Sequence, residues 1–366
     1  MASRIRSNNK HIRIAAMLRR EIQRGSLPPG SQLPSYEEML DRYGVARVTL
    51  AQAIAELKNE GVLRSEGRGG LFVTERSIEL NHFALVMSYS MPTEVPSRFH
   101  EALTQAASRL SQRPDQQIVV YKDVQQREDN EAYHHLVGEV QRNRLAGLFF
   151  IGNPNNAFDV KHSPLFTHPI PRLATSPEPV PGLPLIDIDW SAYIAALEDC
   201  LEKYQVRRVA VLALGQAELL TAVLRTLKAR NVELSADMPI CLGRSAMSSA
   251  AAVVRLLFDL PRDKQPQAIV FLDDNLLPLG VEGMRPDVRS RVGRDLCLIS
   301  PCNWPASPQV DVPVKLVGLD CSALLQHVVD ALRRQARAGG KENSQRLKYH
   351  VITDDQYQSA SLVNAG

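Results

Sequence analysis

Paired acids and adjacent histidines are the side chains of this 366-residue sequence whose types and spacing could support catalysis or metal binding. They are Asp187 with Asp189, Asp273 with Asp274, and His134 with His135. A metal ion needs three or four ligands close together, and general acid–base chemistry needs two groups that face one substrate. The histidines have no acidic or cysteine partner at ligand spacing, and the acids stand near the ends of apolar runs, where carboxylates usually meet solvent or a ligand. We therefore expect no metal site.

The sequence lacks the motifs of nucleophilic and phosphate-binding enzymes. No G-x-S-x-G or G-x-x-x-x-G-K-[ST] occurs, and the glycines at 67–70 follow a helical pattern and precede an extended one, the reverse of a phosphate loop. The five cysteines form no C-x-x-C pair, so we interpret them as buried thiols. They are Cys200, Cys241, Cys297, Cys302 and Cys321. We expect a protein that is not an enzyme and that carries no cofactor.

Basic side chains concentrate near the amino terminus. Residues 1–76 contain 13 basic and 8 acidic side chains, a net charge of +5, whereas residues 77–366 have a net charge of −2. A local concentration of cations attracts phosphate groups, which makes DNA a candidate partner and a solvated surface the alternative. The sequence has no apolar window long enough to cross a membrane and no apolar stretch behind its basic start, so we expect a cytoplasmic protein without a membrane partner.

The basic segment has the pattern of three helices. Apolar residues recur at four-residue steps over 11–24, which predicts an amphipathic helix that stops at residue 25. Ser35 stands three residues before Glu38, the spacing of a capping box, so a second helix is expected over 36–42 and ends at Gly44. A third pattern begins at residue 45 and ends near residue 61. Two short helices joined by a glycine-containing turn form a helix-turn-helix.

Two short extended runs follow these helices. Residues 62–63 and 71–73 are apolar, and the tip at 65–70 holds three glycines and one arginine, Arg68. A ribbon with such a tip can approach a sugar-phosphate backbone closely, and an arginine there can enter a minor groove. The alternative is an ordinary hairpin with permissive glycines. After three helices, the pattern favours a DNA-binding wing.

Four spaced motifs carry a resemblance to a known family. The stretches are 25–35 (GSLPPGSQLPS), 43–50 (YGVARVTL), 59–63 (NEGVL) and 67–73 (GRGGLFV). Together they resemble the winged helix-turn-helix of GntR-type bacterial transcription regulators. The resemblance implies a regulator, most often a repressor, that binds an inverted-repeat operator in double-stranded DNA as a homodimer. A palindromic operator mirrors the two-fold symmetry of such a dimer.

The resemblance also assigns DNA contacts. The start of the third helix would enter the major groove, where Arg47 can hold guanine O6 and N7 together. Val48 and Thr49 would meet neighbouring base edges. The remaining contacts, to phosphates and the minor groove, are expected from Ser35, Tyr36, Arg68, Gly69 and Lys10. The sequence departs from the family at Glu37 and Ala51, where arginines are frequent, and at Ala46, which replaces the usual Ser or Thr cap and costs roughly 1 kcal/mol.

The remainder of the chain alternates between apolar runs and helical patterns. Strands are expected near 83–87, 117–121, 146–151, 208–214, 268–272 and 296–300, and helices near 98–110, 130–141, 219–229, 250–258 and 322–337. Continuous apolar strands separated by helices indicate βαβ units and parallel sheets that are covered on both faces. The segments 144–150, 207–212, 266–280 and 295–300 resemble, in order, the LacI-type effector domain, which is similar to periplasmic sugar-binding proteins.

We therefore predict an α/β protein with an N-terminal winged helix-turn-helix and a two-lobed, periplasmic-binding-protein-like body with parallel sheets. The DNA-binding domain is expected at 1–76, a linker at 77–81, the effector-binding and dimerisation domain at 82–356 and a tail at 357–366. Proline-rich stretches suggest crossings between the lobes near 184–190 and 300–305, and a third is expected near 340–347. The combination of a GntR-type head and a LacI-type body resembles arabinose-responsive repressors.

The body resemblance implies a small-molecule effector, a sugar or a sugar derivative, in a cleft between the lobes. Polar residues at the carboxyl ends of strands line such clefts. The expected contacts are Ser88, Ser90, Asp123, Asn153, Asp273, Asp274 and Asn275, with Trp304 at a crossing, where its ring could stack on a sugar. Loop-end polar residues and a packed hinge tryptophan are the alternatives.

Two departures leave the ligand open. LacI-type sugar binders usually carry an aspartate where Asn275 falls and an arginine where Leu219 falls. Either Asp274 and other groups recognise an atypical ligand, or the cleft has lost sugar binding and mainly dimerises. For the whole chain, the alternative to a regulator is a cytosolic solute-binding or dimerisation module without specific DNA recognition.

Overall fold

Three helices and a two-stranded ribbon form the amino-terminal head. The elements are α1 (Ala2–Gln23), α2 (Tyr36–Tyr43), α3 (Arg47–Asn59), β1 (Leu63–Ser65) and β2 (Leu71–Val73). In this computed structural model the described residues are 2–23, 26–28, 30–59, 62–66, 70–74, 81–88, 97–113, 115–176, 178–214, 217–337 and 346–364. The three helices and the ribbon were predicted from the sequence. Helix α1 begins earlier than the predicted residue 11, because neither glycine nor proline interrupts residues 2–10.

The head has its own apolar core. Leu18 of α1, Met39 of α2, and Leu50 and Leu57 of α3 are fully buried in it. Arg19 is also buried, and its guanidinium Nη2 donates to Glu56 Oε1 at 3.2 Å, which ties α1 to α3. A buried cation needs such a partner because burial removes its hydration.

The ends of α2 follow from two residues. Ser35 Oγ accepts a hydrogen bond from the Glu38 amide at 3.3 Å, and Glu38 Oε2 accepts one from the Ser35 amide at 2.7 Å. This is the predicted capping box. Gly44 ends the helix at φ 58°, a left-handed conformation that residues with a side chain rarely adopt.

The ribbon is bound to the segment that precedes α2. Strands β1 and β2 are antiparallel, with Leu63 opposite Val73. The Leu33 amide donates to the Leu71 carbonyl at 2.8 Å, and the Val73 amide donates to the Ser31 carbonyl at 2.9 Å. This third extended stretch was not predicted from the sequence.

The whole chain divides into two compact units. Unit 1 comprises residues 1–90, 110–185 and 328–345, and unit 2 comprises residues 91–109, 186–327 and 346–366. Within the body, the chain changes units at 90/91, 109/110, 185/186, 327/328 and 345/346. The expected crossing at 300–305 requires correction, since these residues lie inside unit 2, where β12 and β14 pair in one sheet. The proposed division of the chain at residues 76 and 82 stays a prediction.

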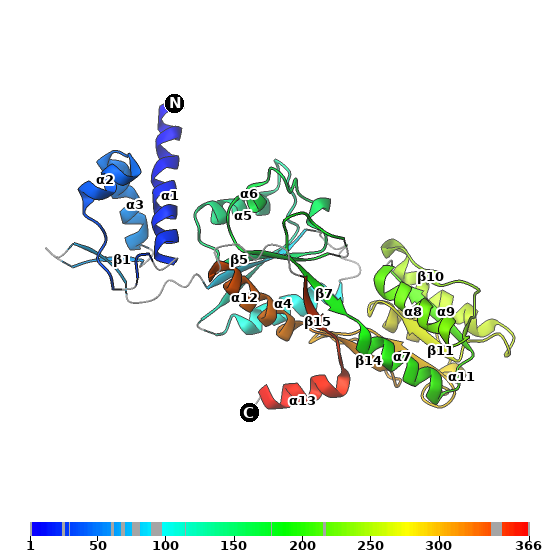
Figure 1. Cartoon of the computed structure of the whole chain (residues 1–366). Helices are drawn as coiled ribbons and strands as arrows, with labels where there is room; N and C mark the ends of the chain where they lie inside the picture. Colours follow the sequence, from blue (N-terminus) through cyan, green and yellow to red (C-terminus); the bar gives the residue numbers. More distant parts are fainter. Residues whose placement is uncertain are drawn as a thin grey trace. The chain divides into compact units, whose positions relative to one another are not determined.

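A six-stranded sheet has the order β15-β7-β6-β5-β3-β4. Its strands are β3 (His82–Met87), β4 (Gln117–Tyr121), β5 (Gly147–Ile151), β6 (Arg172–Thr175), β7 (Leu185–Asp189) and β15 (Arg346–His350). Strands β3 to β7 pair in parallel, and β5 is buried along its whole length. Helices α5 (Glu131–Gln141) and α6 (Pro164–Thr167) lie on one side of β5, and α12 (Cys321–Arg337) lies on the other (Figure 1). A Cβ on Gly147 would come within 3.0 Å of the Leu332 side chain, so α12 packs closely on β5.

The sheet of unit 2 has the order β10-β8-β11-β12-β14-β13, with β9 paired to β8 and β16 to β14. Its strands are β8 (Arg208–Ala213), β9 (Glu233–Leu234), β10 (Ile240–Cys241), β11 (Ala268–Phe271), β12 (Cys297–Ser300), β13 (Asn303–Trp304), β14 (Lys315–Asp320) and β16 (Ile352–Thr353). Only β16 is antiparallel to its partner among these described pairs. The parallel sheets confirm the predicted α/β class.

The remaining α-helices lie in unit 2, except for Leu110 at the end of α4, and two short 3-10 turns occur as well. They are α4 (Arg98–Leu110), α7 (Ser191–Lys203), α8 (Ala217–Ala229), α9 (Ala250–Asp259), α10 (Leu276–Glu282), α11 (Pro286–Arg289) and α13 (Asp354–Asn364), with 3-10 turns η2 (Pro154–Asn156) and η3 (Arg244–Ser249). Helix α13 extends into the predicted tail at 357–366 and ends at Asn364. Across the described residues, no helix is long and apolar enough to cross a membrane.

Candidate functional site

The first turn of α3 presents side chains to solvent. Its inner face is fixed by Leu50 and Leu57, which are buried in the head core. Arg47 is exposed, Thr49 is half-buried, and Val48 is 69% exposed, an unusual position for an apolar side chain. The helix therefore offers a cation and two methyl groups to whatever approaches this end.

The predicted residues of α2 and α3 lie together. The Arg47 guanidinium carbon is 5.8 Å from the centre of the Tyr36 ring, within range of a cation–π contact. Tyr36 is the first residue of α2, directly after the cap Ser35. The geometry brings four of the predicted DNA contacts to one surface, which we call the α2–α3 surface: Ser35, Tyr36, Arg47 and Val48.

Acidic groups limit what the start of α2 can bind. The Glu38 carboxylate accepts the Ser35 amide, and that backbone hydrogen bond is the main reason why the pKa of Glu38 lies below its usual value. The side chain is therefore ionised at neutral pH and occupies one amide that a phosphate would otherwise use. A hydrogen bond from the Ser35 side chain to the same carboxylate is a further cause of the lowered pKa.

The other predicted DNA contacts are less defined. Lys10 is exposed on α1. Arg68 and Gly69 lie outside the described residues. At the base of the ribbon, the Arg64 guanidinium forms an ion pair with Glu66 and lies 5.8 Å from the centre of the Phe72 ring.

A polar cluster follows β11 in unit 2. Asp273 Oδ1 accepts from the Asn275 amide at 2.9 Å and from Asn275 Nδ2 at 2.6 Å. Asn275 Oδ1 accepts from the Arg98 amide at 3.1 Å, and Asp274 Oδ2 accepts from Asn303 Nδ2 at 2.9 Å. The three predicted residues of this segment are thus held in a network, together with Arg98 and Asn303, which the sequence did not single out.

Asp274 is a buried carboxyl with an altered pKa. Only 2% of the Asp274 surface is exposed to solvent. Burial, followed by the negative charge of Asp273, raises its pKa to about 7, although the hydrogen bond from Asn303 and the charge of Arg98 oppose the change. At neutral pH this group can therefore either donate or accept a hydrogen bond.

The expectation for Trp304 requires correction. Its side chain is 2% exposed, and its ring stacks on Tyr357 of α13 at 4.8 Å between ring centres and 14° between planes. It lies in β13 inside unit 2, not at a crossing. Because a ring of the same chain covers it, Trp304 does not offer a face to a sugar.

The candidate residues of unit 1 end neighbouring strands. Ser88, Asp123 and Asn153 follow β3, β4 and β5, which are adjacent in the sheet. Ser88 is 1% exposed, and no hydrogen-bond partner for its hydroxyl occurs among the described residues. Asn153 instead caps η2 and donates to Glu178 at 3.1 Å. Ser90 lies outside the described residues.

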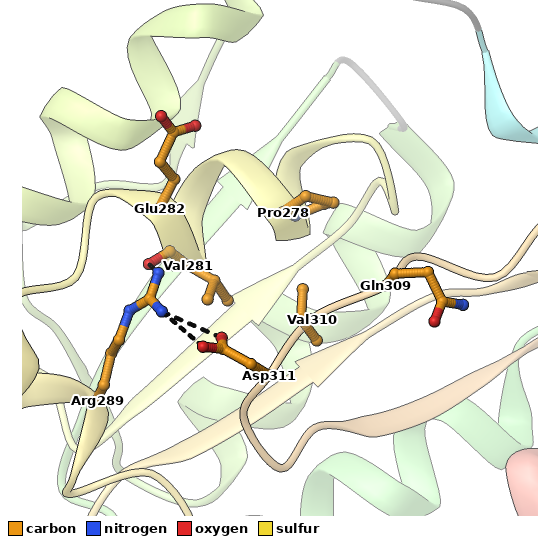
Figure 2. A pocket seen from close by; sticks show the side chains of 7 residues that line it. All are labelled: Pro278, Val281, Glu282, Arg289, Gln309, Val310 and Asp311. Carbon is orange, nitrogen blue, oxygen red and sulfur yellow. Dashed lines mark hydrogen bonds and ion pairs between the residues drawn. The ribbon is translucent and has the colours of Figure 1, made fainter.

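A pocket of about 410 Å³ in unit 2 contains none of the predicted effector contacts. Figure 2 shows Arg289 and Asp311 pointing toward each other within it, at 2.8 and 3.1 Å between Nη1 and the two carboxylate oxygens. Nη2 of the same arginine donates to the Val281 carbonyl at 3.0 Å. The cation is therefore paired within the protein, and the pocket does not indicate a particular ligand. It is lined by Pro278, Val281, Glu282, Arg289, Gln309, Val310 and Asp311.

Residues 11–73 match the model of the family "Bacterial regulatory proteins, gntR family". The head is a GntR-type winged helix-turn-helix domain. It is 36% identical over 72 residues to the mannosyl-D-glycerate transport/metabolism system repressor MngR of Escherichia coli, a match that covers 20% of this chain and 30% of that protein. It is 39% identical over 70 residues to the transcriptional repressor NagR of Bacillus subtilis, covering 19% and 28%. The matched region thus spans about a third of the length of these relatives.

The body is similar in fold to LacI regulators. A LacI family transcriptional regulator from Lactobacillus casei with bound glucose matches with a TM-score of 0.54 and 15% identity, over 75% of this chain and 97% of that one. A LacI family transcriptional regulator from Enterococcus faecium with bound ribose matches with a TM-score of 0.55 and 12% identity, over 75% of this chain and 96% of that one. The chain therefore joins a GntR-type head to a body with the LacI fold.

Asn303 and Arg98 had weak signals in the sequence. Asn303 directly precedes Trp304, which was predicted to stack on a sugar, and Arg98 begins a predicted helix. Their association with Asp274 and Asn275 depends on contacts between residues far apart in the chain, which no local pattern of the GntR-type or LacI-like segments reveals.

Proposed function

We propose that this protein is a transcriptional repressor that binds operator DNA as a homodimer and is controlled by a small-molecule effector. The observation that supports this most directly is the α2–α3 surface, which lies within the segment that matches the GntR model. The proposal includes a cytoplasmic location, where DNA is accessible, and no enzymatic activity. A solute-binding module without DNA recognition is not favoured, because it leaves the exposed Arg47 and Val48 without a role.

The proposed reading of DNA uses the geometry of α3. Arg47 holds a guanine in the major groove through two parallel hydrogen bonds, and Val48 contacts a thymine methyl. Thr49 and Ser35 reach phosphates or base edges, and Tyr36 holds the arginine in place. Lys10, Arg68 and Gly69 contribute contacts to the backbone and minor groove. Two heads bound to the two halves of an inverted repeat supply the affinity that one small head lacks.

The proposed effector is a polyhydroxylated molecule such as a sugar derivative. In unit 1, the buried Ser88 hydroxyl has no hydrogen-bond partner among the described residues, and it can both donate to and accept from a ligand hydroxyl. Hydroxyl groups suit such a residue because each can donate and accept. Relatives of the LacI fold hold glucose and ribose, which supports the ligand class without identifying the molecule.

A selection from random duplexes, followed by anisotropy titrations at moderate salt, tests DNA recognition. The selected sequence should be an inverted repeat, bound at least about 10³-fold more tightly than a scrambled duplex of the same length. Equal binding to both duplexes would overturn the proposal. A companion measurement of mass in solution, with and without DNA, should give two chains per operator.

Thermal-shift measurements test the effector. A ligand at 100 times its dissociation constant adds about 2.7 kcal/mol to the stability of the native protein. A sugar or sugar derivative that raises the melting temperature should also change operator affinity. Flat melting curves across a broad library would favour the view that the body only dimerises.

A further inference from the structure

Two cysteines of unit 2, one on a helix and one on a strand, line the same pocket. Cys200 lies in the last turn of α7, and Cys297 is the first residue of β12. Helix α7 packs on β12, and the two cysteines are close enough for each to change the pKa of the other's thiol. Both residues are buried, at 7% and 4% exposure. From the sequence, all five cysteines were interpreted as buried thiols because no C-x-x-C pair occurs, and these two are 97 positions apart in the chain.

A pocket gives small molecules access to this pair. It has a volume of about 240 Å³, and both Cys200 and Cys297 line it. Lys203 and Lys315 line it as well, together with the single acid Asp199. The two sulfurs therefore meet a small cavity with more cationic than anionic side chains, whereas a structural cysteine is usually enclosed by apolar groups.

The two thiols are not equivalent. The Cys297 thiol donates to Cys200, and this hydrogen bond lowers the pKa of Cys200, with further help from the charges of Lys315 and Lys203 and against burial and Asp199. The same hydrogen bond and burial raise the pKa of Cys297 well above its usual value. Cys200 is thus the sulfur that loses its proton first, and only a thiolate attacks an electrophile at an appreciable rate.

The other cysteines lack this arrangement. Burial raises the pKa of Cys302 and of Cys321. Cys241 is exposed in β10, so its oxidation is the reference against which the oxidation of Cys200 and Cys297 is compared.

We propose that Cys200 and Cys297 form a redox-active dithiol, which a peroxide that enters this pocket converts into an intramolecular disulfide. The Cys200 thiolate attacks one peroxide oxygen, the O–O bond breaks, and the leaving oxygen takes up a proton to become an alcohol or water. Cys200 is then a sulfenic acid. The Cys297 sulfur attacks the Cys200 sulfur, an S–S bond forms, the S–O bond breaks, and water leaves with the Cys297 proton. Two thiols are oxidised by two electrons, and one peroxide is reduced.

Peptide mapping of the reduced full-length chain tests the site. The protein is treated with a near-stoichiometric amount of hydrogen peroxide, its remaining thiols are blocked with N-ethylmaleimide, and it is digested without reductant for mass spectrometry. A peptide pair joined through Cys200 and Cys297, lighter by two hydrogen atoms and separated by dithiothreitol, is the expected product. N-ethylmaleimide labels only the thiols that peroxide has not oxidised. If Cys241 is oxidised while Cys200 and Cys297 are still fully labelled, the proposal is wrong.

Single substitutions separate the two roles. Cys297→Ser should accumulate a sulfenic acid at Cys200 that dimedone traps, and Cys200→Ser should leave Cys297 unmodified. Cys241→Ser is the matched control and should form the disulfide at the wild-type rate. If Cys297 is oxidised as fast in Cys200→Ser as in the wild type, Cys200 is not the attacking sulfur and the proposal is wrong. Should either variant fold poorly, the wild-type peptide map still decides, and neither result depends on DNA or effector binding.

Discussion

The exposed end of α3 combines three properties in adjacent side chains. Arg47 supplies a planar cation with paired donors, Val48 supplies methyl groups, and the Tyr36 ring restricts the arginine before any partner arrives. A guanidinium that is already held in place loses less conformational freedom when it binds a base. The residue that matters most for base recognition is therefore also the one whose orientation is prepared by a second helix.

Arg47→Ala should remove base discrimination rather than general DNA binding. We expect the preference for the operator over a scrambled duplex to fall by roughly 1–3 kcal/mol, or about 5-fold to 150-fold, because the bidentate contact with guanine is lost. Arg47→Lys keeps the charge but not the paired donors and should lose most of the same preference. Lys58→Ala, at the exposed end of α3, is the matched control, and an equal loss there would show that only charge is involved.

Asp274→Asn should change how stability depends on pH. The folded pKa of about 7 lies above the ordinary value of 3.8, so the native state binds this proton more tightly than the unfolded state. Its stabilising effect is complete below about pH 4 and is lost as the pH rises through 7. The wild type should therefore lose free energy of unfolding between pH 5 and pH 8, and the asparagine variant should lose less.

Urea unfolding at the two pH values checks this prediction. Asp263→Asn, at an exposed position, provides the comparison and should behave as the wild type does. If the free energy of unfolding changes equally between pH 5 and pH 8 in the wild type and in Asp274→Asn, this carboxyl does not titrate in that pH range.

At the scale of elements, local signals predicted the head well. The capping box of Ser35 and Glu38 and the stop at Gly44 act within one turn, so the sequence was sufficient to place α2. Elements that depend on distant partners were missed. Strand β14 and the short strands β9, β10, β13 and β16 depend on pairing with other strands. Helix α7 was also missed, although Tyr193, Leu197 and Leu201 recur at four-residue steps and could have predicted it. All three side chains are buried in the structure.

The candidate site was predicted unevenly for the same reason. Positions at strand ends were correctly placed after β3, β4, β5 and β11, because strand boundaries are local. The bond between Asn303 and Asp274, and the ring of Tyr357 over Trp304, arise from folding of distant segments. Sequence reasoning therefore located candidate positions but not their partners.

Ser35→Ala should loosen α2 without unfolding the body. Loss of the cap costs about 1 kcal/mol, which corresponds to roughly fivefold faster opening of the helix. Hydrogen exchange of the α2 amides should increase by that factor, while exchange in β5 and β11 stays unchanged. Ser26→Ala, an exposed serine ahead of the helix, is the control. Equal exchange in both variants would show that the capping box contributes little.

At the scale of the whole molecule, charge is divided between the head and the rest of the chain. Residues 1–76 have a net charge of +5 and residues 77–366 have a net charge of −2. Neutralised phosphates release counterions, so the salt dependence of binding reports how many cations contact DNA. The division predicts that this dependence arises in the head.

Lys10→Ala should weaken binding to every duplex by a similar factor. The slope of log affinity against log salt should decrease by about one, because one phosphate contact is lost. Lys264→Ala, an exposed lysine of unit 2, should leave the slope unchanged. Titrations at four salt concentrations measure both slopes, and a change with Lys264→Ala would place the body on the DNA.

The hydrogen bonds between residues 30–33 and β2 affect which residues of the DNA-binding head can be substituted. Backbone hydrogen bonds, such as those from Leu33 to Leu71 and from Val73 to Ser31, join the ribbon to the segment that leads into α2. Amide and carbonyl groups are the same for every residue except proline, so this joint tolerates replacement of exposed side chains. Substitutions at positions 47–49 can therefore be exchanged among related heads to retarget the protein to a new sequence, with the frame that carries the ribbon preserved.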